Sequence, residues 1–519
     1  MRTNYLFVLL VVNAQAFCFR RRTNEESAGR DDGILRRSLF FLNCGDNDGE
    51  DNSENTPPTA APTESPTPLP TESPTLFPTD PPIDPWASCV NGSPHHDKPI
   101  FKDFTPCRSA QGCPIESECC IQTYCVCFEP DNRGVECVPN RDIRSTVQPV
   151  ALQGGAEWAD PESYQAKAIA WLRNDPFSAS LSDTRIQQRY ALACIYYATY
   201  AIANIYTVVE PRGWIDPTGW ISNIDECTWF GITCNANSEV EKIVLASNRI
   251  TGTFPPETTI MASSLTYIDL FRNSVYNSGD AGNAWLGRLT NLRKLFYGQT
   301  NFEYKNGIPT QISQLTNLEE YDCSFTRYSG PLVGSTFSPL QNLEYLVLSG
   351  NAYNTSIPVE IGNLSNLKFL YVQNASIAGD LSFMEPMQSI IECWVDQNPR
   401  LGGPIPTTIG NVQTLQSLSI TTCGLDGPIP SELGDLRNMV RMWLHDNMLT
   451  GTVPLELGNL FKLQTLALEE NLLLGVMPED ICLNRVPLGL LQVLEADCGG
   501  ATPEIQCDCC TCCEGCLST

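Results

Sequence analysis

The densest cluster of reactive side chains lies at the C-terminus, where six cysteines fall within the ten residues from Cys507 to Cys516. Thiols at this spacing can bind a soft metal ion, take part in redox exchange, or pair as disulfides. A metal site requires reduced, deprotonated sulfurs, whereas an oxidising compartment favours disulfides. The chemistry of this tail therefore depends on the location of the chain and on the elements that precede the tail.

Other catalytic chemistry has little support in the sequence. The three histidines are His95, His96 and His445. We find no glycine-rich phosphate loop, kinase signature, Gly-x-Ser-x-Gly elbow or His-Glu-x-x-His helix. The acidic pairs Glu469-Glu470 and Glu319-Glu320 fit a solvated rim better than a glycosidase site, and two adjacent histidines are a weak metal signal. We expect a protein that is not an enzyme and has no cofactor and no metal site.

The N-terminus indicates secretion. Arg2 precedes an apolar run from Leu6 to Val12, and Ala14-Gln15-Ala16 has the small-x-small pattern of a cleavage site, so residues 1–16 are predicted to be a signal peptide. The run is too short to cross about 30 Å of hydrocarbon. Basic residues after Phe17 leave a two-part plastid leader as an alternative. The 24 cysteines suit an oxidising compartment, and the net charge of -27 argues against binding to nucleic acid or anionic lipid.

Composition divides the rest of the chain into segments. Residues 17–55 are acidic and predicted to be disordered. Residues 56–86 are a Pro/Thr-rich stalk, which we expect to be extended and O-glycosylated. Residues 87–140 hold eight cysteines and few apolar residues, which predicts a disulfide-rich module of unknown pairing and function. Residues 155–235 have the pattern of a helical cap.

Four sequons predict N-glycosylation, at Asn91, Asn354, Asn363 and Asn374. They lie on both sides of the uncharged run Tyr190–Val209. One membrane crossing would not leave both sides in the lumen, so we expect a buried helix there and no integral membrane span.

Residues 236–500 repeat the frame Leu-x-x-Leu-x-Leu-x-x-Asn, as in the stretches that begin at Leu265 and Leu343. The closing position falls at 248, 273, 300, 326, 351, 375, 398, 423, 447 and 471, and "LLQVLEADCG" is a degenerate eleventh copy. The leucines should face inward from a short strand, and the asparagines should bond to main chain and link one coil to the next. The closing residue is not asparagine at Thr300, Thr326, Ala375 and Cys423, so we expect an imperfect ladder.

The copies also share x-Gly-x-Ile-Pro-x-x-Ile/Leu-Gly-Asn/Asp-Leu, as in "LDGPIPSELGDL". This closely resembles the plant-type leucine-rich repeat. The resemblance implies an α/β fold, a right-handed solenoid with a concave parallel sheet, a second short strand at Gly-x-Ile-Pro, and mostly 3₁₀ segments outside.

Both ends of a solenoid need caps. The segment "ECTWFGITC" is similar to the N-terminal cap motif of the family, which implies a disulfide between Cys227 and Cys234. At the other end, Cys482 and Cys498 flank the last coil and could pair across it. The whole layout looks like secreted and cell-surface repeat proteins of plants and microalgae.

Residues between the leucines should point outward on the concave face. The candidate ligand-binding residues there are Tyr345, Phe369, Tyr371, Trp394, Asp396, Arg441, Trp443 and His445. We expect the aromatic side chains to be exposed because leucines fill the inner positions, although they could instead pack on one another along the sheet. Asn374 falls on the same face, where a glycan would cover part of the surface.

These features favour a secreted or cell-wall-associated recognition protein that binds a protein, peptide or glycan through the concave face. In this respect the chain resembles receptor-like repeat ectodomains and cell-wall inhibitor proteins. The alternative is a structural matrix protein that is anchored by the stalk and the cysteine-rich modules.

In an oxidising compartment the tail at residues 501–519 should hold disulfides rather than a metal. Adjacent residues such as Cys509 and Cys510 are awkward partners for each other, so some should pair elsewhere, with Cys18 and Cys44 or with another chain. The tail is thus predicted to lock the repeat domain or to link it to a disulfide-bonded oligomer. Cys323 and Cys393 occupy inward leucine positions and should be buried thiols.

Overall fold

The computed structural model describes residues 126–128, 136–138, 142–200, 213–277, 282–499 and 503–512. The expected signal peptide, acidic segment, stalk and last seven residues lie outside this range, as do Asn91 and most of the cysteine-rich module. Two strands of that module, β1 (Val126–Phe128) and β2 (Glu136–Val138), pair antiparallel. No helix in the described part of the chain is both long and apolar enough to cross a membrane.

Helices precede the repeats, as the sequence predicts. They are α2 (Ile143–Val147), α3 (Tyr164–Arg173) and α4 (Asp183–Thr199), with short 3₁₀ turns η2 (Gln148–Val150), η3 (Ala156–Ala159) and η4 (Pro176–Ser180). Ser163 and Ser182 cap α3 and α4 by accepting main-chain N–H bonds, which satisfies amides that have no partner within the helix. The apolar face of α4 packs on α3 and, through Leu192 and Ile195, on the first coil. The helices therefore cover the open end of the solenoid.

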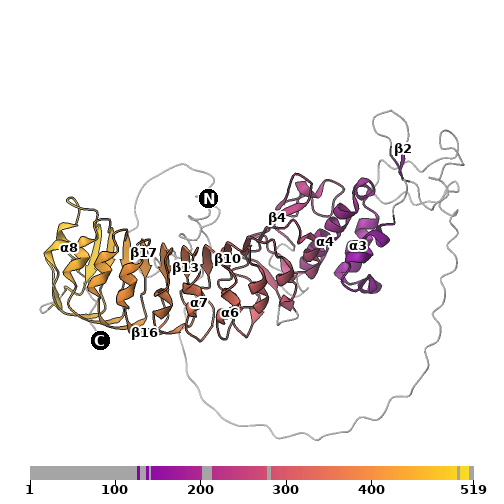
Figure 1. Cartoon of the computed structure of the whole chain (residues 1–519). Coiled ribbons are helices and arrows are strands. Elements are labelled where there is room, and N and C mark those ends of the chain that lie inside the picture. Colours follow the sequence, from indigo (N-terminus) through magenta and orange to yellow (C-terminus); the bar gives the residue numbers. More distant parts are fainter. Residues whose placement is uncertain are drawn as a thin grey trace, which may run out of the picture. The chain divides into compact units, whose positions relative to one another are not determined.

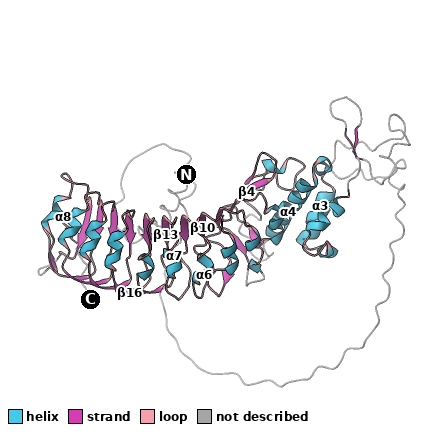
Figure 2. Ribbon diagram, in the orientation of Figure 1, coloured by secondary structure: helices cyan, strands magenta, loops and turns pink. Residues whose placement is uncertain are grey.

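A sheet of 13 strands forms the concave side of the repeat domain (Figures 1 and 2). From the N-terminal end its strands are β3 (Ile232–Cys234), β4 (Val240–Val244), β6 (Tyr267–Asp269), β8 (Lys294–Phe296), β10 (Glu320–Asp322), β12 (Tyr345–Val347), β13 (Phe369–Tyr371), β15 (Glu392–Trp394), β17 (Ser417–Ser419), β19 (Arg441–Trp443), β21 (Thr465–Ala467), β24 (Val493–Ala496) and β26 (Thr511–Cys512). β3 pairs antiparallel with β4, and the other neighbours are parallel. The strands from β4 to β24 match the ten predicted copies and the degenerate eleventh.

A second set of strands forms the other edge of most coils. They are β5 (Thr251–Thr253), β7 (Ser274–Tyr276), β9 (Glu303–Tyr304), β11 (Arg327–Tyr328), β14 (Ala378–Gly379), β16 (Arg400–Pro404), β18 (Gly424–Pro428), β20 (Met448–Gly451), β22 (Leu472–Leu473), β23 (Gly475–Val476) and β25 (Ile505–Gln506). The second strand falls at Gly-x-Ile-Pro, as expected. Its glycines Gly403, Gly427 and Gly451 have φ of 78, 71 and 80°, a backbone conformation that other residues adopt only with strain.

Short helices, mostly 3₁₀, lie on the side opposite the large sheet (Figure 2). They are η6 (Pro256–Met261), η7 (Leu286–Arg288), η8 (Thr310–Gln314), α6 (Gly334–Phe337), α7 (Val359–Gly362), η9 (Ser382–Met384), η10 (Thr407–Asn411), η11 (Ser431–Asp435), η12 (Leu455–Asn459) and α8 (Glu479–Leu483). Leucines from strands and helices meet in one continuous apolar core between them.

The asparagine ladder is present and is built from multiple bonds per residue. The Asn398 amide donates to the carbonyls of Val395 and Asp396 in its own turn and to Val372 in the preceding coil, while its oxygen accepts from two further amides. Where asparagine is absent, Cys423 donates through its thiol to Val395 and Thr421. The ladder therefore continues through at least one of the substituted positions.

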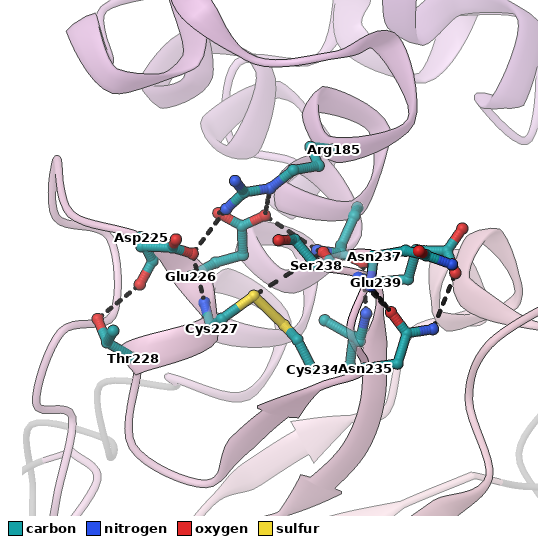
Figure 3. Close-up of a disulfide and its surroundings, with 12 residues drawn as sticks. Arg185, Asp225, Glu226, Cys227, Thr228, Cys234, Asn235, Asn237, Ser238 and Glu239 are labelled. Atoms are coloured by element: carbon teal, nitrogen blue, oxygen red, sulfur yellow. Dashed lines mark hydrogen bonds and ion pairs between the residues drawn. A yellow bond between two sulfur atoms is a disulfide. The ribbon is translucent and has the colours of Figure 1, made fainter.

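Figure 3 shows the N-terminal cap, where Cys227 is disulfide-bonded to Cys234 with a Cα–Cα distance of 5.4 Å. Cys227 lies in η5 (Glu226–Thr228) and Cys234 ends β3, so the bond ties a turn to the first strand of the sheet. The side chain of Asp225 holds this turn by accepting from the amide of Cys227 at 2.9 Å.

The predicted Cys482–Cys498 bond is wrong, because Cys482 is bonded to Cys509. Residues 503–512 continue around the solenoid, with β25 pairing with β23 and β26 pairing with β24. Cys509 lies between these two strands and so reaches α8, which carries Cys482, whereas Cys498 follows the concave strand β24. Cys498 is disulfide-bonded to a different partner, and Cys507 pairs with Cys510.

The sulfurs of Cys482, Cys507 and Cys509 lie within 4.8 Å of one another, but all three are committed to disulfides and are not free thiolates for a metal. Cys323 and Cys393 are free thiols and are fully buried, as expected from their inward positions. Burial raises the pKa of both thiols to about 12, which keeps them protonated and unreactive.

Candidate ligand-recognition surface

Strand register places the candidate residues in two rows across the concave face. Tyr371, Trp394, Ser419 and Trp443 occupy matched positions on β13, β15, β17 and β19. We call Tyr371, Trp394 and Trp443 the aromatic row. The residues two positions further along the strands form the polar row, which comprises Gln373, Asp396, His445 and Glu469. The main-chain pairing continues there, as shown by the bond of 3.0 Å from the Asp446 amide to the Glu469 carbonyl.

The aromatic side chains point outward but are less exposed than the sequence suggests. Tyr371 and Trp394 are each 5% exposed, which contradicts the expectation that they are open to solvent. The reason is that neighbouring parallel strands lie about 4.8 Å apart, so large rings in one column must touch. The ring centroids of Tyr371 and Trp394 are 5.0 Å apart, and Tyr345 lies 5.6 Å from Tyr371. In this part of the face the aromatic side chains therefore pack on one another along the sheet, which was the alternative to exposure.

Trp394 and Trp443 meet edge to face across the intervening strand β17, with centroids 6.2 Å apart. They can do so because β17 carries small outward residues, Ser417 and Ser419, which are buried. The indole N–H of Trp394 donates to the Ser417 hydroxyl at 2.9 Å, so its polar atom is satisfied. Trp443 remains half-buried, and it is therefore the tryptophan of this row that a ligand can reach.

A second set of bonds positions the charged residues beside the row. Glu392 accepts from the Tyr371 hydroxyl at 2.8 Å and lies 3.4 Å from the Arg441 guanidinium. The guanidinium carbon of Arg441 lies 5.7 Å from the Trp443 ring centroid, which is a cation–π distance. Phe369, next to Tyr345 on this side of the face, is half-buried. Arg441 and Trp443 are thus held in place as a unit.

The polar row contains acids that burial makes weaker. Asp396 accepts from the hydroxyl of Ser419 at 2.6 Å and from the amide of Thr421 at 3.0 Å, yet burial raises its pKa. Burial also raises the pKa of Glu469 to about 7 and lowers that of His445. His445 and Glu469 approach to 3.8 Å between Nδ1 and Oε1. A buried charge without full compensation disfavours its ionised form, which explains both directions.

Four buried polar atoms of this surface have no hydrogen-bond partner among the described residues. They are Gln373 Nε2, Arg441 Nε, His445 Nδ1 and Glu469 Oε2. Leaving a buried donor or acceptor unpaired costs about 1–3 kcal/mol, so such atoms are rare in folded proteins unless a ligand or water completes them. Gln373 and Glu392 were not among the predicted site residues. The repeat frame could have identified Gln373, since it occupies the position of Asp396 in the preceding coil.

The sequons on the repeats are accessible. Asn354, Asn363 and Asn374 are all exposed. Asn374 borders a hollow of about 310 Å³ with Arg327 and Asn351 among its other residues. A glycan at Asn374 would therefore lie beside this hollow.

Acids with raised pKa predict that the protein becomes more stable as the pH is lowered from 8 to 5. Asp322, which is 6% exposed, has its pKa raised by burial to about 6, and Glu469 to about 7. Because the unfolded chain ionises these groups near pH 4, the stability they contribute is complete below that pH and is lost as the pH rises to 6–7. Each shift corresponds to about 3 kcal/mol. Burial lowers the pKa of His445, so this residue opposes the trend as the pH falls below the ordinary histidine pKa of about 6.5.

Scanning calorimetry between pH 5 and pH 8 measures this effect. Asp322→Asn should reduce the change of Tm between pH 5 and pH 7 while retaining the acceptor for the Ser324 amide, which lies 2.8 Å from Asp322. A Tm that rises from pH 5 to pH 8 would contradict the prediction.

Comparison with known proteins supports the fold assignment. The Leucine Rich Repeat family pattern matches residues 342–364. Receptor-like protein 6 of Arabidopsis thaliana is 26% identical over 245 residues, which is 42% of this chain and 24% of that protein. Receptor-like protein kinase 7 of the same plant is 28% identical over 162 residues, or 31% and 16% of the two chains. The chain is a plant-type leucine-rich-repeat protein.

Solved structures of plant receptors are also similar to the leucine-rich-repeat protein. The Arabidopsis receptor kinase HAESA, in complex with the peptide hormone IDA and the co-receptor SERK1, aligns at a TM-score of 0.45 and 26% identity, covering 52% of this chain and 49% of that one. The ectodomain of the membrane receptor kinase GASSHO1/SCHENGEN3 aligns at 0.39 and 28%, covering 53% and 29%. The leucine-rich-repeat protein spans 16–24% of the length of the two curated relatives.

Proposed function

We propose that the concave face of the repeat domain recognises an extended peptide outside the cell, without catalysing a reaction. The observation that carries this proposal is the concentration of four unpartnered buried polar atoms beside the aromatic row. Arg441 and Gln373 offer donors, Glu469 offers an acceptor, and His445 Nδ1 offers a donor or an acceptor according to its tautomer. A peptide lying across the strands supplies both carbonyl and N–H groups, so it complements such a mixed row better than an apolar ligand does. The disulfides support an oxidising, extracellular location.

The accessible part of the proposed site lies towards the C-terminal repeats. Arg441, Trp443, His445 and Glu469 are partly exposed, while Tyr371 and Trp394 are buried and support them. Aromatic and arginine side chains dominate the energy of most interfaces, so we expect Trp443 and Arg441 to carry most of the affinity.

Trp443→Ala should weaken binding at least about ten-fold, since truncating a central interface residue costs 1–2 kcal/mol or more. The probe is a set of twelve-residue peptides selected from a random display library against the purified protein, with Kd measured by calorimetry. The matched control is Phe461→Ala, because Phe461 is an aromatic residue between η12 and β21, outside the concave strands, and is 67% exposed. Equal effects of both substitutions, or unchanged Kd for Trp443→Ala, would rule out the concave site.

The same measurements separate recognition from the structural alternative. A matrix protein held by its cysteine-rich segments should yield no peptides whose binding depends on Trp443. Selective binding to an array of glycans without binding to peptides would change the proposed ligand class.

A further inference from the structure

His445 and Glu469 form a distinct pair within the polar row. His445 follows β19 and Glu469 follows β21, and their closest atoms, Nδ1 and Oε1, are 3.8 Å apart. Their side chains are 33% and 15% exposed. The pair is thus partly buried, but a ligand on the concave face can still reach it.

The pair presents two polar atoms that lack a hydrogen-bond partner. His445 Nδ1 and Glu469 Oε2 are both buried and have no hydrogen-bond partner in the described part of the chain. In a neutral imidazole one ring nitrogen is an acceptor, and an ionised carboxylate is acceptor only. In the tautomer that carries its proton on Nε2, His445 Nδ1 is an acceptor like the carboxylate of Glu469, and the two atoms then need a group that donates more than one hydrogen.

The surrounding charges favour a cation as that group. The acids that act on the pair lie on several of the surrounding elements: Asp396 after β15, Asp446 after β19, Glu470 after β21, Glu495 in β24 and Asp497 after it. Arg441, the cationic side chain at the start of β19, lies against Glu392 instead. The electrostatic environment therefore stabilises added positive charge at the pair.

We infer that the His445–Glu469 pair is the subsite for a cationic group of the ligand, an ammonium or a guanidinium, and that a proton competes for the same place. This inference rests on the proposed recognition function. A guanidinium donates to Glu469 Oε2 and to His445 Nδ1 at once, while the adjacent Trp443 offers an aromatic face. When a proton is bound instead, the carboxyl group and the imidazole share it and both acceptors are used.

The arrangement also specifies the rest of the ligand. Arg441 Nε is an unpartnered donor on the same strand, four residues before His445. Four residues of extended chain span about 13 Å. The preferred ligand therefore carries an oxygen acceptor at Arg441 and a basic group that reaches about 13 Å from it along the direction of the strand.

Competition with a proton gives a defined pH dependence. Burial raises the pKa of Glu469 to about 7, so the carboxylate is mostly ionised at pH 8 and mostly protonated at pH 6. Affinity for a cation should consequently fall about ten-fold between these two values. A neutral donor lacks the charge attraction to the carboxylate, so its affinity should change less over this range.

The test uses two small probes that differ only in charge, N-acetyl-arginine methylamide and its uncharged isostere N-acetyl-citrulline methylamide. NMR of the histidine rings reports binding directly, since the chain has three histidines and His445→Gln identifies the signal of His445. The arginine probe should shift this signal saturably at pH 8. Its Kd should be about ten times higher at pH 6, and the probe should cause no shift in Glu469→Gln. The citrulline probe should leave it unchanged.

Glu479→Gln is the matched control, because it removes the same charge from an exposed position in α8. Equal shifts with both probes, equal effects of Glu469→Gln and Glu479→Gln, or tighter binding at pH 6 would overturn the inference. Peptides selected through Trp443 can bind even if this subsite fails, so failure here is distinguishable from failure of the recognition function. A thermal unfolding scan of Glu469→Gln verifies that the variant is folded.

Discussion

Glu226→Ala should lower the free energy of unfolding by about 3–5 kcal/mol, the typical cost of removing one partner from a buried ion pair. The Glu226 side chain is fully buried and lies within 2.9 Å of nitrogens of Arg185, Gln188 and Arg189. Arg189 is also fully buried, and its second partner is Asp175 at 2.6 Å. Without Glu226 the positive charge of Arg189 would be only partly compensated in the interior.

In Glu226→Ala the cap should lose the contact between α4 and η5, the turn that precedes the first strand of the sheet. The bonds of Glu226 connect these two elements (Figure 3). Urea unfolding followed by tryptophan fluorescence measures the loss, since Trp229 lies in this cap with Arg189 5.1 Å from its ring centroid. Glu162→Gln is the control. Glu162 pairs with Lys167 at 3.0 Å but is 83% exposed, so its removal should cost less than about 1 kcal/mol. Similar losses for the two variants would contradict the role assigned to burial.

The repeat frame predicted the fold because its period has a direct structural meaning. Each inward leucine and each closing asparagine recurs once per coil, so a sequence pattern alone determines the strand, its register and its direction. The outward direction of Tyr371 and Trp394 followed from the same frame. Their burial did not, because it depends on which side chains stand opposite on neighbouring strands, such as the small Ser417 and Ser419 beneath the tryptophans.

The disulfides show the same limit. Cys227 and Cys234 belong to a local motif with fixed spacing, and they pair as that motif implies. The C-terminal pairing depends on how residues 503–512 return around the last coil, which spacing along the chain does not reveal. Cys509 meets Cys482 only because the chain continues for part of another turn.

Asn398→Ala is the second change with a large expected effect, a loss of about 3–5 kcal/mol in the free energy of unfolding. Asn398 has no solvent exposure and accepts from the amides of Ala375 and Ile377 at 3.1 and 2.9 Å. It donates to the carbonyl of Val372 in the preceding coil at 2.8 Å. Alanine would leave several buried main-chain groups unpaired at once. Chemical denaturation monitored by circular dichroism measures the loss.

Two further variants test whether the loss comes from the ladder bonds of Asn398 or from removing any asparagine. Asn366→Ala removes an exposed residue with one bond of 2.8 Å to Gln341, so it should change stability by less than about 1 kcal/mol. Asn398→Cys should fall between the two, because the thiol of Cys423 already makes bonds across and within coils at the equivalent position. If Asn398→Ala were as mild as Asn366→Ala, leucine packing alone would have to hold adjacent coils in register. If Asn398→Cys were no better than alanine, the thiol of Cys423 would be a passive filler rather than part of the ladder.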